Sequence, residues 1–331
     1  MTDVLAVDGG ASKTHLARLG RDGALLELVR GPESSPQTLG LERALAVLDR
    51  LFEQAGGRSG EADVAQLNMS GVDFPSEERE LREAIEARRW AERVVVDNDT
   101  FAVLRAGTDR TWGVGIVCGF GTNCSGVSPK GRVFRLPAIG PVSGDWGGAG
   151  DLGRTALYHA IRAGDGRGGR TGLQRSVPAH FGMRTARQVM EALYTDRLAE
   201  ERLAELAPVV FAEAAAGDVI AAELVGRQAD EIAVMATAAI RKLGMRALDP
   251  DVVLGGGIVR NEWRPFLERI TAGVHAVAPA ARIVRLTAPP VVGAAMLGLD
   301  LLGSGQAAHA RTRASLTHRR LDPHTRGRKE R

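Results

Sequence analysis

The sequence predicts an α/β protein made of two similar units, each a mixed sheet flanked by helices. The chain has 331 residues, which is more than one core usually holds. Short apolar strands alternate with amphipathic helices, as is typical of α/β proteins. The segments 4–30 and 113–136 also share one design, in which three strands are joined by two glycine-bearing turns. Such a duplication constrains the topology more than any single motif does.

The first unit is expected to open with three strands and to continue with alternating helices and strands. A glycine-rich turn at 20–23 is a hairpin signal, and Leu41, Leu45 and Leu48 recur at helical spacing. The expected strands are 4–7, 15–18, 24–30, 64–69 and 93–96, and the expected helices are 39–55, 76–89 and 100–106.

The second unit repeats this opening and then contains more helix. Pro289 and Pro290 mark the start of the last helix. The expected strands are 113–118, 124–128, 133–136, 251–254 and 282–286; the expected helical regions are 149–163, 185–243, 259–274 and 291–302. We expect one domain at 1–108, completed by the helix at 290–302, and a second domain at 109–289.

Residues 303–331 form a basic tail, with eight Lys or Arg against two acids, although the whole chain carries only +3. Because the tail has little apolar periodicity, we expect it to be disordered. It could contact nucleic acid or an anionic surface, but a solvated extension explains the charge as well. We therefore expect no nucleic-acid partner.

The other composition signals indicate a cytoplasmic protein. No apolar run approaches the roughly 20 residues of a membrane span, so we expect no membrane partner. The N-terminus lacks the pattern of a secretory signal. Cys118 and Cys124 are the only cysteines, and we expect them to be free thiols in a reducing compartment.

The turn after the first strand has the residues of a phosphate-binding loop. Glycines let backbone N–H groups approach an anion, hydroxyls and a Lys add donors and charge, and Asp8 could hold Mg²⁺ directly or through water. An ordinary hairpin with a glycine turn is an equally good interpretation of this stretch alone. The candidate phosphate ligands are Gly9, Gly10, Ser12, Lys13 and Thr14.

Five motifs, taken together and in order, resemble those of the N-acetylglucosamine kinase and BadF/BadG-type ATPase family, within the actin-like ATPase superfamily. The resemblance covers residues 3–302. It implies two RNase-H-like domains with Mg²⁺, ATP and a sugar in the cleft between them, and a homodimer. The motifs are Asp8-Gly9-Gly10-Ala11-Ser12-Lys13-Thr14, Asn98-Asp99, Gly119-Phe120-Gly121-Thr122-Asn123, Gly144-Asp145-Trp146-Gly147 and Leu254-Gly255-Gly256-Gly257.

The resemblance also implies roles for single residues. Asp99 matches the general base for the acceptor hydroxyl, and Asp8 matches the acid that organises Mg²⁺. The implied ATP-binding residues are Gly9, Gly10, Ser12, Lys13, Thr14, Gly121, Thr122, Gly255, Gly256 and Gly257. The implied sugar-binding residues are Ser35, Ser70, Gly71, Asn98, Asp99, Asn123, Gly140 and Asp145.

Two positions depart from the family pattern. Phe120 stands where the family usually has Thr, so a hydroxyl near the nucleotide is lost and bulk is added. The loop that often supplies an Asn to the sugar reads Ser34-Ser35-Pro36-Gln37, so either Ser35 or Gln37 takes that role or the sugar differs.

From the residues alone, several candidates keep a second interpretation. Asp99 could be the N-cap of the helix at 100–106, a position where Asp is favoured. Asp97 would point the same way if the strand continued, so spacing does not separate the two. Asp145 could close an Asx turn, and Trp146 fits a partly buried core as well as a sugar-stacking position.

Phosphoryl transfer needs in-line positioning, charge neutralisation and a carboxylate to accept the proton. We therefore predict an ATP- and Mg²⁺-dependent kinase of an amino sugar, with N-acetylglucosamine converted to its 6-phosphate. Glucosamine or another hexose is the alternative acceptor. Two other functions stay open: a BadF-type ATPase that drives a partner protein, and a non-catalytic module that senses sugar or nucleotide.

Overall fold

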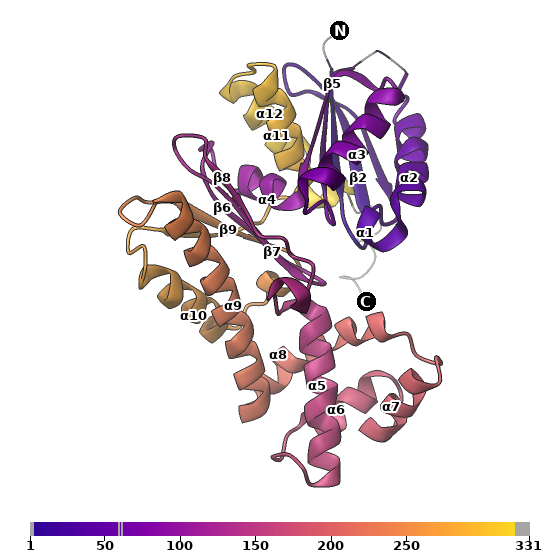
Figure 1. The fold of residues 1–331 in the computed structure, drawn as a ribbon, viewed down its shortest axis with the longest axis vertical. Helices are drawn as coiled ribbons and strands as arrows, with labels where there is room; N and C mark the ends of the chain where they lie inside the picture. Colours follow the sequence, from indigo (N-terminus) through magenta and orange to yellow (C-terminus); the bar gives the residue numbers. More distant parts are fainter. Residues whose placement is uncertain (1–2, 59, 61, 322–331) are drawn as a thin grey trace.

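The structure is a computed structural model that describes residues 3–58, 60 and 62–321, and it contains two five-stranded sheets (Figure 1). The first sheet has the order β3-β2-β1-β4-β5. β1 pairs antiparallel with β2 and parallel with β4. The strands are β1 (Asp3–Gly9), β2 (Thr14–Gly20), β3 (Leu25–Gly31), β4 (Ala62–Met69) and β5 (Ala91–Asn98).

The second sheet repeats the topology of the first. Its order is β10-β9-β6-β7-β8, in which β6 takes the central place of β1. β6 likewise pairs antiparallel with the strand that follows it and parallel with β9. The predicted duplication is therefore confirmed. The strands are β6 (Gly113–Cys118), β7 (Thr122–Val127), β8 (Val133–Arg135), β9 (Asp251–Gly255) and β10 (Arg282–Arg285).

The two faces of the first sheet are covered by different helices, because successive side chains of a strand alternate between faces. Leu5 and Val7 pack into the core beneath α2 (Leu41–Gln54) and α3 (Pro75–Ala87). The other face packs against α4 (Asp99–Gly107) and α11 (Val291–Leu301), with residues of both helices in one buried cluster. The last long helix of the chain thus returns to the first sheet.

Helix α4 is buried on all sides, because it lies between the two sheets (Figure 1). Ala102 and Ala106 pack with the first sheet, whereas Val103 and Leu104 pack with Val253 of β9. Gly293 of α11 comes so close that a Cβ there would lie 1.8 Å from the Ala102 carbonyl oxygen. α4 and its neighbours therefore join the two units.

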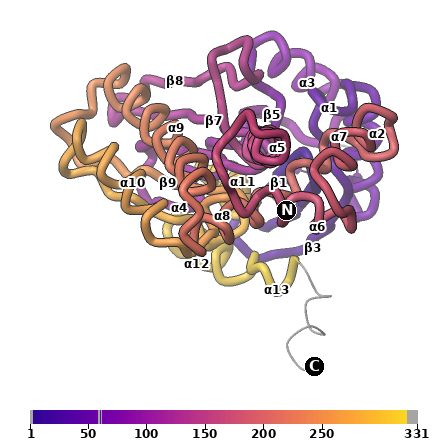
Figure 2. Tube along the Cα trace, turned by 90° about the horizontal axis from the view of Figure 1, so that it is seen from below, coloured from indigo at the N-terminus to yellow at the C-terminus, as the bar shows by residue number. Residues whose placement is uncertain are grey.

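Further helices extend the second unit, and Figure 2 shows α5 between the pair α9 and α10 and the pair α6 and α7. Some bounds differ from expectation. The helix expected at 39–55 begins at Leu41 as α2, and Gly40, with φ of 78°, separates it from α1 (Pro36–Leu39), which lies where a loop was expected. α6 was not predicted from the sequence at all. The added helices are α5 (Gly148–Asp165), α6 (Leu173–His180), α7 (Ala186–Tyr194), α8 (Ala207–Ala215), α9 (Val219–Leu243) and α10 (Arg264–His275), with short 3-10 turns η1 (Pro141–Ser143), η2 (Glu200–Leu206) and η3 (Ile258–Arg260).

The prediction of a disordered tail from residue 303 is wrong for residues 306–321. This segment forms α12 (Gln306–Ser315) and α13 (His318–Leu321), and it buries Ala308, Thr312, Leu316 and Leu321. Arg313 donates hydrogen bonds to the Ala106 and Thr108 carbonyl oxygens. The charged groups of this segment are thus used in packing it against the body. The predicted tail also includes 322–331, which lie outside the described residues.

Among the residues that the structure describes, no helix is both long enough and apolar enough to cross a membrane.

We predict that Leu316→Ala destabilises the protein, because Leu316 is 1% exposed and anchors the C-terminal segment. The free energy of unfolding should fall by about 2–4 kcal/mol in urea titrations. Arg320→Ala is the matched control, since Arg320 is exposed in the same segment and its loss should cost at most about 0.5 kcal/mol. Equal midpoints for Leu316→Ala and the unaltered protein would show that the segment contributes no packing energy.

Candidate active site

The first glycine turn joins β1 to β2 and is closed by a hydrogen bond from the Gly10 N–H to the Lys13 carbonyl oxygen, at 3.0 Å. Ser12 is exposed in this turn and Lys13 is half-buried. Thr14 is fully buried, and its hydroxyl bonds to the Pro32 carbonyl oxygen and to Ser34 Oγ, both at 2.7 Å. Of the two predicted hydroxyl ligands, only Ser12 is therefore open to a phosphate.

Positive charges from both units act on Lys13 beside this turn. Burial lowers the pKa of Lys13, and the charges of Arg30 and Arg260 lower it further. Arg260 belongs to η3 of the second unit, and it also lowers the pKa of His318 in α13, where burial is again the largest cause. Such a concentration of positive charge favours an anion. Neither Arg260 nor His318 was a predicted ligand, because Arg260 lies three residues beyond the Leu254-Gly255-Gly256-Gly257 motif and His318 lies in the segment expected to be disordered.

A row of polar residues crosses the first sheet near the ends of β1, β4 and β5. Strand register places Asp8 beside Asn68, and Asn68 beside Asp97. On the other side, Asp8 pairs with His15, which pairs with Arg30. His15 is buried, and its Nδ1 lies 3.7 Å from an Asp8 carboxylate oxygen. The polar groups of the site thus share one edge of the sheet, as parallel strands allow.

Asp99 is the first residue of α4, but it is not the cap of this helix. Asn98 is the N-cap, because its side-chain oxygen accepts from the Thr100 N–H at 3.1 Å and from the Thr100 hydroxyl at 2.7 Å. The interpretation of Asp99 as the N-cap is therefore wrong. Burial raises the pKa of Asp99 to about 7, and the charges of Asp8 and Asp73 raise it too. A carboxylate with such a pKa suits a general base near neutral pH.

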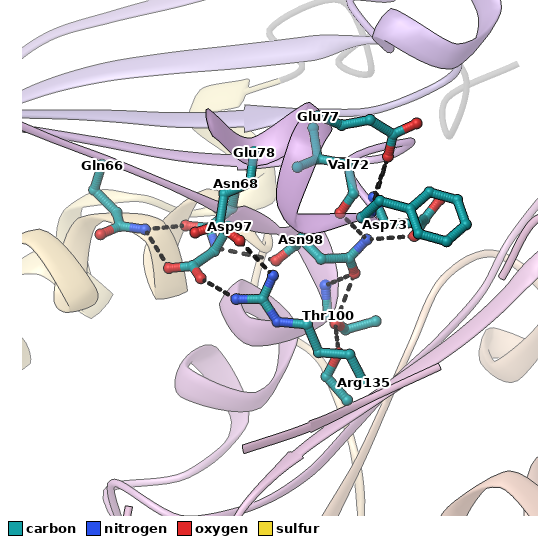
Figure 3. A network of polar contacts seen from close by, with 12 residues as sticks. Gln66, Asn68, Val72, Asp73, Glu77, Glu78, Asp97, Asn98, Thr100 and Arg135 are labelled. Atoms are coloured by element: carbon teal, nitrogen blue, oxygen red, sulfur yellow. Dashed lines mark hydrogen bonds and ion pairs between the residues drawn. The ribbon is translucent and has the colours of Figure 1, made fainter. Parts of the chain in front are cut away.

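Asp97 is already paired within the protein (Figure 3). Its carboxylate pairs with Arg135 of β8 at 2.8 Å. The same guanidinium binds Glu78 of α3 at 2.7 Å. Burial raises the pKa of Asp97 to about 6, and Arg135 opposes that rise. Asp97 thus belongs to an ion-pair cluster that links the two units.

Asp73 is a residue of the site to which the sequence analysis assigned no role. Its Oδ1 accepts from Asn98 Nδ2 at 3.0 Å and from Asn123 Nδ2 at 2.9 Å. Burial and the charge of Glu77 raise its pKa to about 6. The available signal was an acid three residues after Ser70, just past the end of a strand parallel to β1.

The network leaves Asn98 little capacity for a ligand. Its amide nitrogen donates to Asp73 and, at 3.2 Å, to the Val72 carbonyl oxygen, while its oxygen accepts twice from Thr100 (Figure 3). All the usual hydrogen-bonding positions of an Asn side chain are thus used inside the protein. The predicted sugar contact of Asn98 does not fit this arrangement, whereas Asn123 gives Asp73 only one amide hydrogen.

Three other predicted sugar residues lie together beside the first turn. The Ser70 N–H donates to the Gly9 carbonyl oxygen at 2.7 Å. Gly71 has φ of 74°, and a Cβ there would lie 2.6 Å from Ser35 Oγ. Ser35 is 1% exposed, so its hydroxyl faces the chain more than the solvent. The loops that carry Ser35 and Gly71 therefore pack against each other.

The second glycine turn lies at the equivalent end of β6. The Gly119 N–H donates to the Gly121 carbonyl oxygen at 2.9 Å, and the Phe120 side chain is 48% exposed. Thr122 is buried, and its hydroxyl is 3.5 Å from Cys118 Sγ.

Both cysteines are free, as expected, and both are buried. Burial raises the pKa of Cys118 to about 12. Neither thiol is therefore a nucleophile at neutral pH.

The loop before α5 holds Asp145 in a tight network. Asp145 Oδ2 accepts from the Ser143 hydroxyl at 2.7 Å and from the Gly140 N–H at 3.2 Å, so the carboxylate closes its own loop. The charge of Asp145 nevertheless raises the pKa of Asp73, so the two carboxylates are close enough to interact.

Trp146 follows Asp145 in the same loop, and the Arg227 guanidinium lies 3.8 Å from its ring centroid. Trp146 is also packed against the core, as its core interpretation predicts.

The third glycine cluster follows β9. Gly256 has φ of 100°, and a Cβ there would lie 2.2 Å from the Cys118 carbonyl oxygen. A Cβ on Gly255 would meet Val103 of α4 at 2.9 Å, but Gly257 has no neighbour within 4 Å of its own. Gly255 and Gly256 thus serve close packing, and Gly257 is the member of the triplet with open space for a ligand.

A sequence profile of the BadF/BadG/BcrA/BcrD ATPase family matches residues 5–298. The chain belongs to this family. The resemblance stated from the five motifs is therefore confirmed.

Two curated relatives have kinase names. The N-acetylmuramic acid/N-acetylglucosamine kinase of Clostridium acetobutylicum is 26% identical over 278 residues, which cover 81% of this chain and 90% of the relative. The N-acetyl-D-glucosamine kinase of Dictyostelium discoideum is 26% identical over 318 residues, which cover 89% of this chain and 97% of the relative.

Solved structures share the fold of this ATPase. A candidate N-acetylglucosamine kinase from Chromobacterium violaceum superposes with a TM-score of 0.67 at 24% identity, covering 90% of this chain and 99% of the other. A glucokinase of the ROK family from Streptomyces griseus, in complex with glucose and AMPPNP, has a TM-score of 0.52 at 17% identity, covering 89% and 98%. The predicted two-domain, actin-like α/β fold is thus confirmed.

We predict that Asp99→Asn stabilises the fold at pH 8. The pKa of Asp99 rises from 3.8 to about 7 on folding, so the folded form binds the proton more tightly than the unfolded chain does. Its contribution to stability is complete below pH 3.8 and is lost as the pH rises through about 7. The substitution should raise the thermal midpoint by about 2–5 °C at pH 8 and by much less near pH 4.

The control for this pH dependence is Asp165→Asn. The Arg167 guanidinium hydrogen-bonds Asp165 and lowers its pKa, so removal of this charge should bring no gain at pH 8. A midpoint for Asp99→Asn that is unchanged or lower at pH 8 would contradict the buried, charge-crowded setting of this carboxylate.

Proposed function

We propose that the protein is an ATP-dependent kinase that transfers a phosphoryl group to the 6-hydroxyl of N-acetylglucosamine. The observation that supports this most is Asp99, a carboxylate with pKa of about 7 that starts a helix buried between the two units. Membership of an ATPase family and the amino-sugar names of both curated relatives support the nucleotide and the acceptor class. Glucosamine or another hexose is the alternative acceptor.

In this proposal Asp99 orients the acceptor hydroxyl and accepts its proton as the new bond to phosphorus forms. Neutralisation of the phosphate charge falls to Lys13 and Arg260, together with N–H groups of the glycine turns. Because no three His, Cys, Asp or Glu side chains of residues 3–58, 60 and 62–321 form a metal cluster, Mg²⁺ at Asp8 would take its other ligands from phosphate and water. It would supply further charge neutralisation there.

The sugar would lie between the units, with Asn123 offering its second amide hydrogen and Asp145 accepting from a hydroxyl. Both side chains are held in place by hydrogen bonds before a ligand arrives, which reduces the entropy cost of binding. An ATPase that works through an iron–sulfur cluster has less support, because Cys118 and Cys124 are both buried.

ADP release in the presence of ATP and Mg²⁺ tests the function, with no acceptor and then with N-acetylglucosamine, glucosamine, glucose or N-acetylmuramic acid. Release that depends on an amino sugar is the expected result. Equal release without any sugar would contradict a sugar kinase and favour an ATPase that drives a partner. ATP binding without turnover in every tube would favour a sensing module instead.

The base assignment is tested by Asp99→Asn in the same assay. We expect kcat to fall by about 10²–10⁴-fold, the usual contribution of a general base. Asp97→Asn is the matched control two residues away, because Asp97 is already paired with Arg135, and kcat should stay within about tenfold. A fully active Asp99→Asn would overturn the assignment.

The cationic cluster predicts a separate effect on the nucleotide. Arg260→Ala should raise KM for ATP about tenfold and leave KM for the sugar unchanged, because it removes a charge beside Lys13. Arg264→Ala is the control, since this exposed Arg on α10 pairs with Glu268 instead. An unchanged KM for ATP in Arg260→Ala would show that Arg260 does not meet the phosphates.

A further inference from the structure

We propose that Asp73 is a positioning residue of the sugar site, which fixes Asn98 and Asn123 across the boundary between the two units. This inference rests on the proposed function for its substrate but not for its geometry. Asp73 is 8% exposed and follows β4 in the first unit, whereas Asn123 belongs to β7 of the second. A single carboxylate oxygen accepts from both asparagines.

The first consequence concerns Asn98 and through it Asp99. The bond from Asn98 Nδ2 to Asp73, at 3.0 Å, holds the amide so that its oxygen points at the Thr100 N–H and hydroxyl. Asn98 thereby caps α4, and Asp99 is the next residue. The placement of the proposed base thus depends on a cap that Asp73 orients.

The second consequence concerns Asn123. Its amide oxygen accepts from the Cys124 N–H at 2.6 Å and its nitrogen donates to Asp73 at 2.9 Å, so the plane of the amide is fixed from both ends. Only the remaining amide hydrogen is left for a sugar oxygen. Since Asp73 and Asn123 come from different units, this bond also sets how the units meet at the sugar site.

The surroundings of Asp73 support a specific role for its hydrogen bonds to Asn98 and Asn123. The Asp73 N–H donates to Glu77 Oε2 at 2.9 Å, so its backbone is fixed at the start of α3. The charges of Glu77 and Asp145 disfavour a carboxylate here, and Arg135 is the cation that opposes them. Asp73 therefore remains beside other carboxylates, and one of its oxygens accepts hydrogen bonds from two amides. This arrangement fits a residue whose role is to accept hydrogen bonds from Asn98 and Asn123.

The test compares Asp73→Ala with Asp73→Asn in sugar-dependent turnover. Asp73→Ala removes the acceptor, and we expect KM for the sugar to rise at least about tenfold while KM for ATP changes less than about twofold. Asp73→Asn keeps an oxygen that can accept from both amides, so KM for the sugar should return to within about threefold of the unaltered protein. Equal defects in the two variants would overturn a positioning role.

A double-mutant cycle shows whether Asp73 acts through Asn123. The loss in sugar KM for Asp73→Ala combined with Asn123→Ala should be smaller than the sum of the two single losses, because both single variants remove one shared bond while only Asp73→Ala removes the bond to Asn98. Fully additive losses would contradict the proposal.

Hydrogen exchange of the full-length protein gives a readout that needs no turnover. In Asp73→Ala, amide exchange in peptides that contain Thr100 and Cys124 should accelerate at least about fivefold. Asp3→Ala is the matched control, because Asp3 is a buried carboxylate paired with Arg18 at the other end of β1. Exchange that is equally fast in both variants would overturn the proposal. If the unaltered protein uses no sugar, the proposed function fails, but exchange still decides the role of Asp73.

Discussion

The burial of α4 between the two sheets is the constraint on which the rest of the structure depends. Seven consecutive residues of this nine-residue helix are buried, so it is a core element for both units at once. Its backbone passes close to β6, where a Cβ on Gly115 would lie 2.3 Å from the Thr100 carbonyl oxygen. A helix so tightly enclosed can hold the residue at its N-terminus in a fixed place, and that residue is Asp99.

The same burial makes it costly to ionise the carboxylates of the site. The pKa values of Asp73, Asp97 and Asp99 are all raised, with burial as the largest cause each time. For Asp97 the structure opposes this cost with an Arg from the other unit, whereas the favourable contributions to Asp99 from the described part of the chain are hydrogen bonds of nearby backbone. A site that kept Asp99 only for stability would pair it too, so its isolation fits use as a base.

How much the sequence could predict depends on whether a feature is local. The glycine turns, the duplicated strands and Asp99 are recognisable because each is carried by neighbouring residues. Asp73 and Arg260 lie close to recognised motifs, but the groups they act on, such as Asn123 and Lys13, are far away along the chain, so spacing alone could not assign their roles. The helices at 306–321 were missed because Ala308 and Thr312 bury little apolar surface and carry only a weak periodic signal.

The C-terminal helices lie beyond the matched family region, yet they touch both places where the chain passes between the units. Arg313 donates to carbonyl oxygens at the end of α4, where the chain leaves for β6. The backbone of Thr287, on the segment that returns from β10 to α11, acts on His318 and opposes the lowering of its pKa. Any movement of one sheet against the other must bend these two connections. The extension therefore lies against both connections that join the two sheets, and one of these leaves the helix that begins at Asp99.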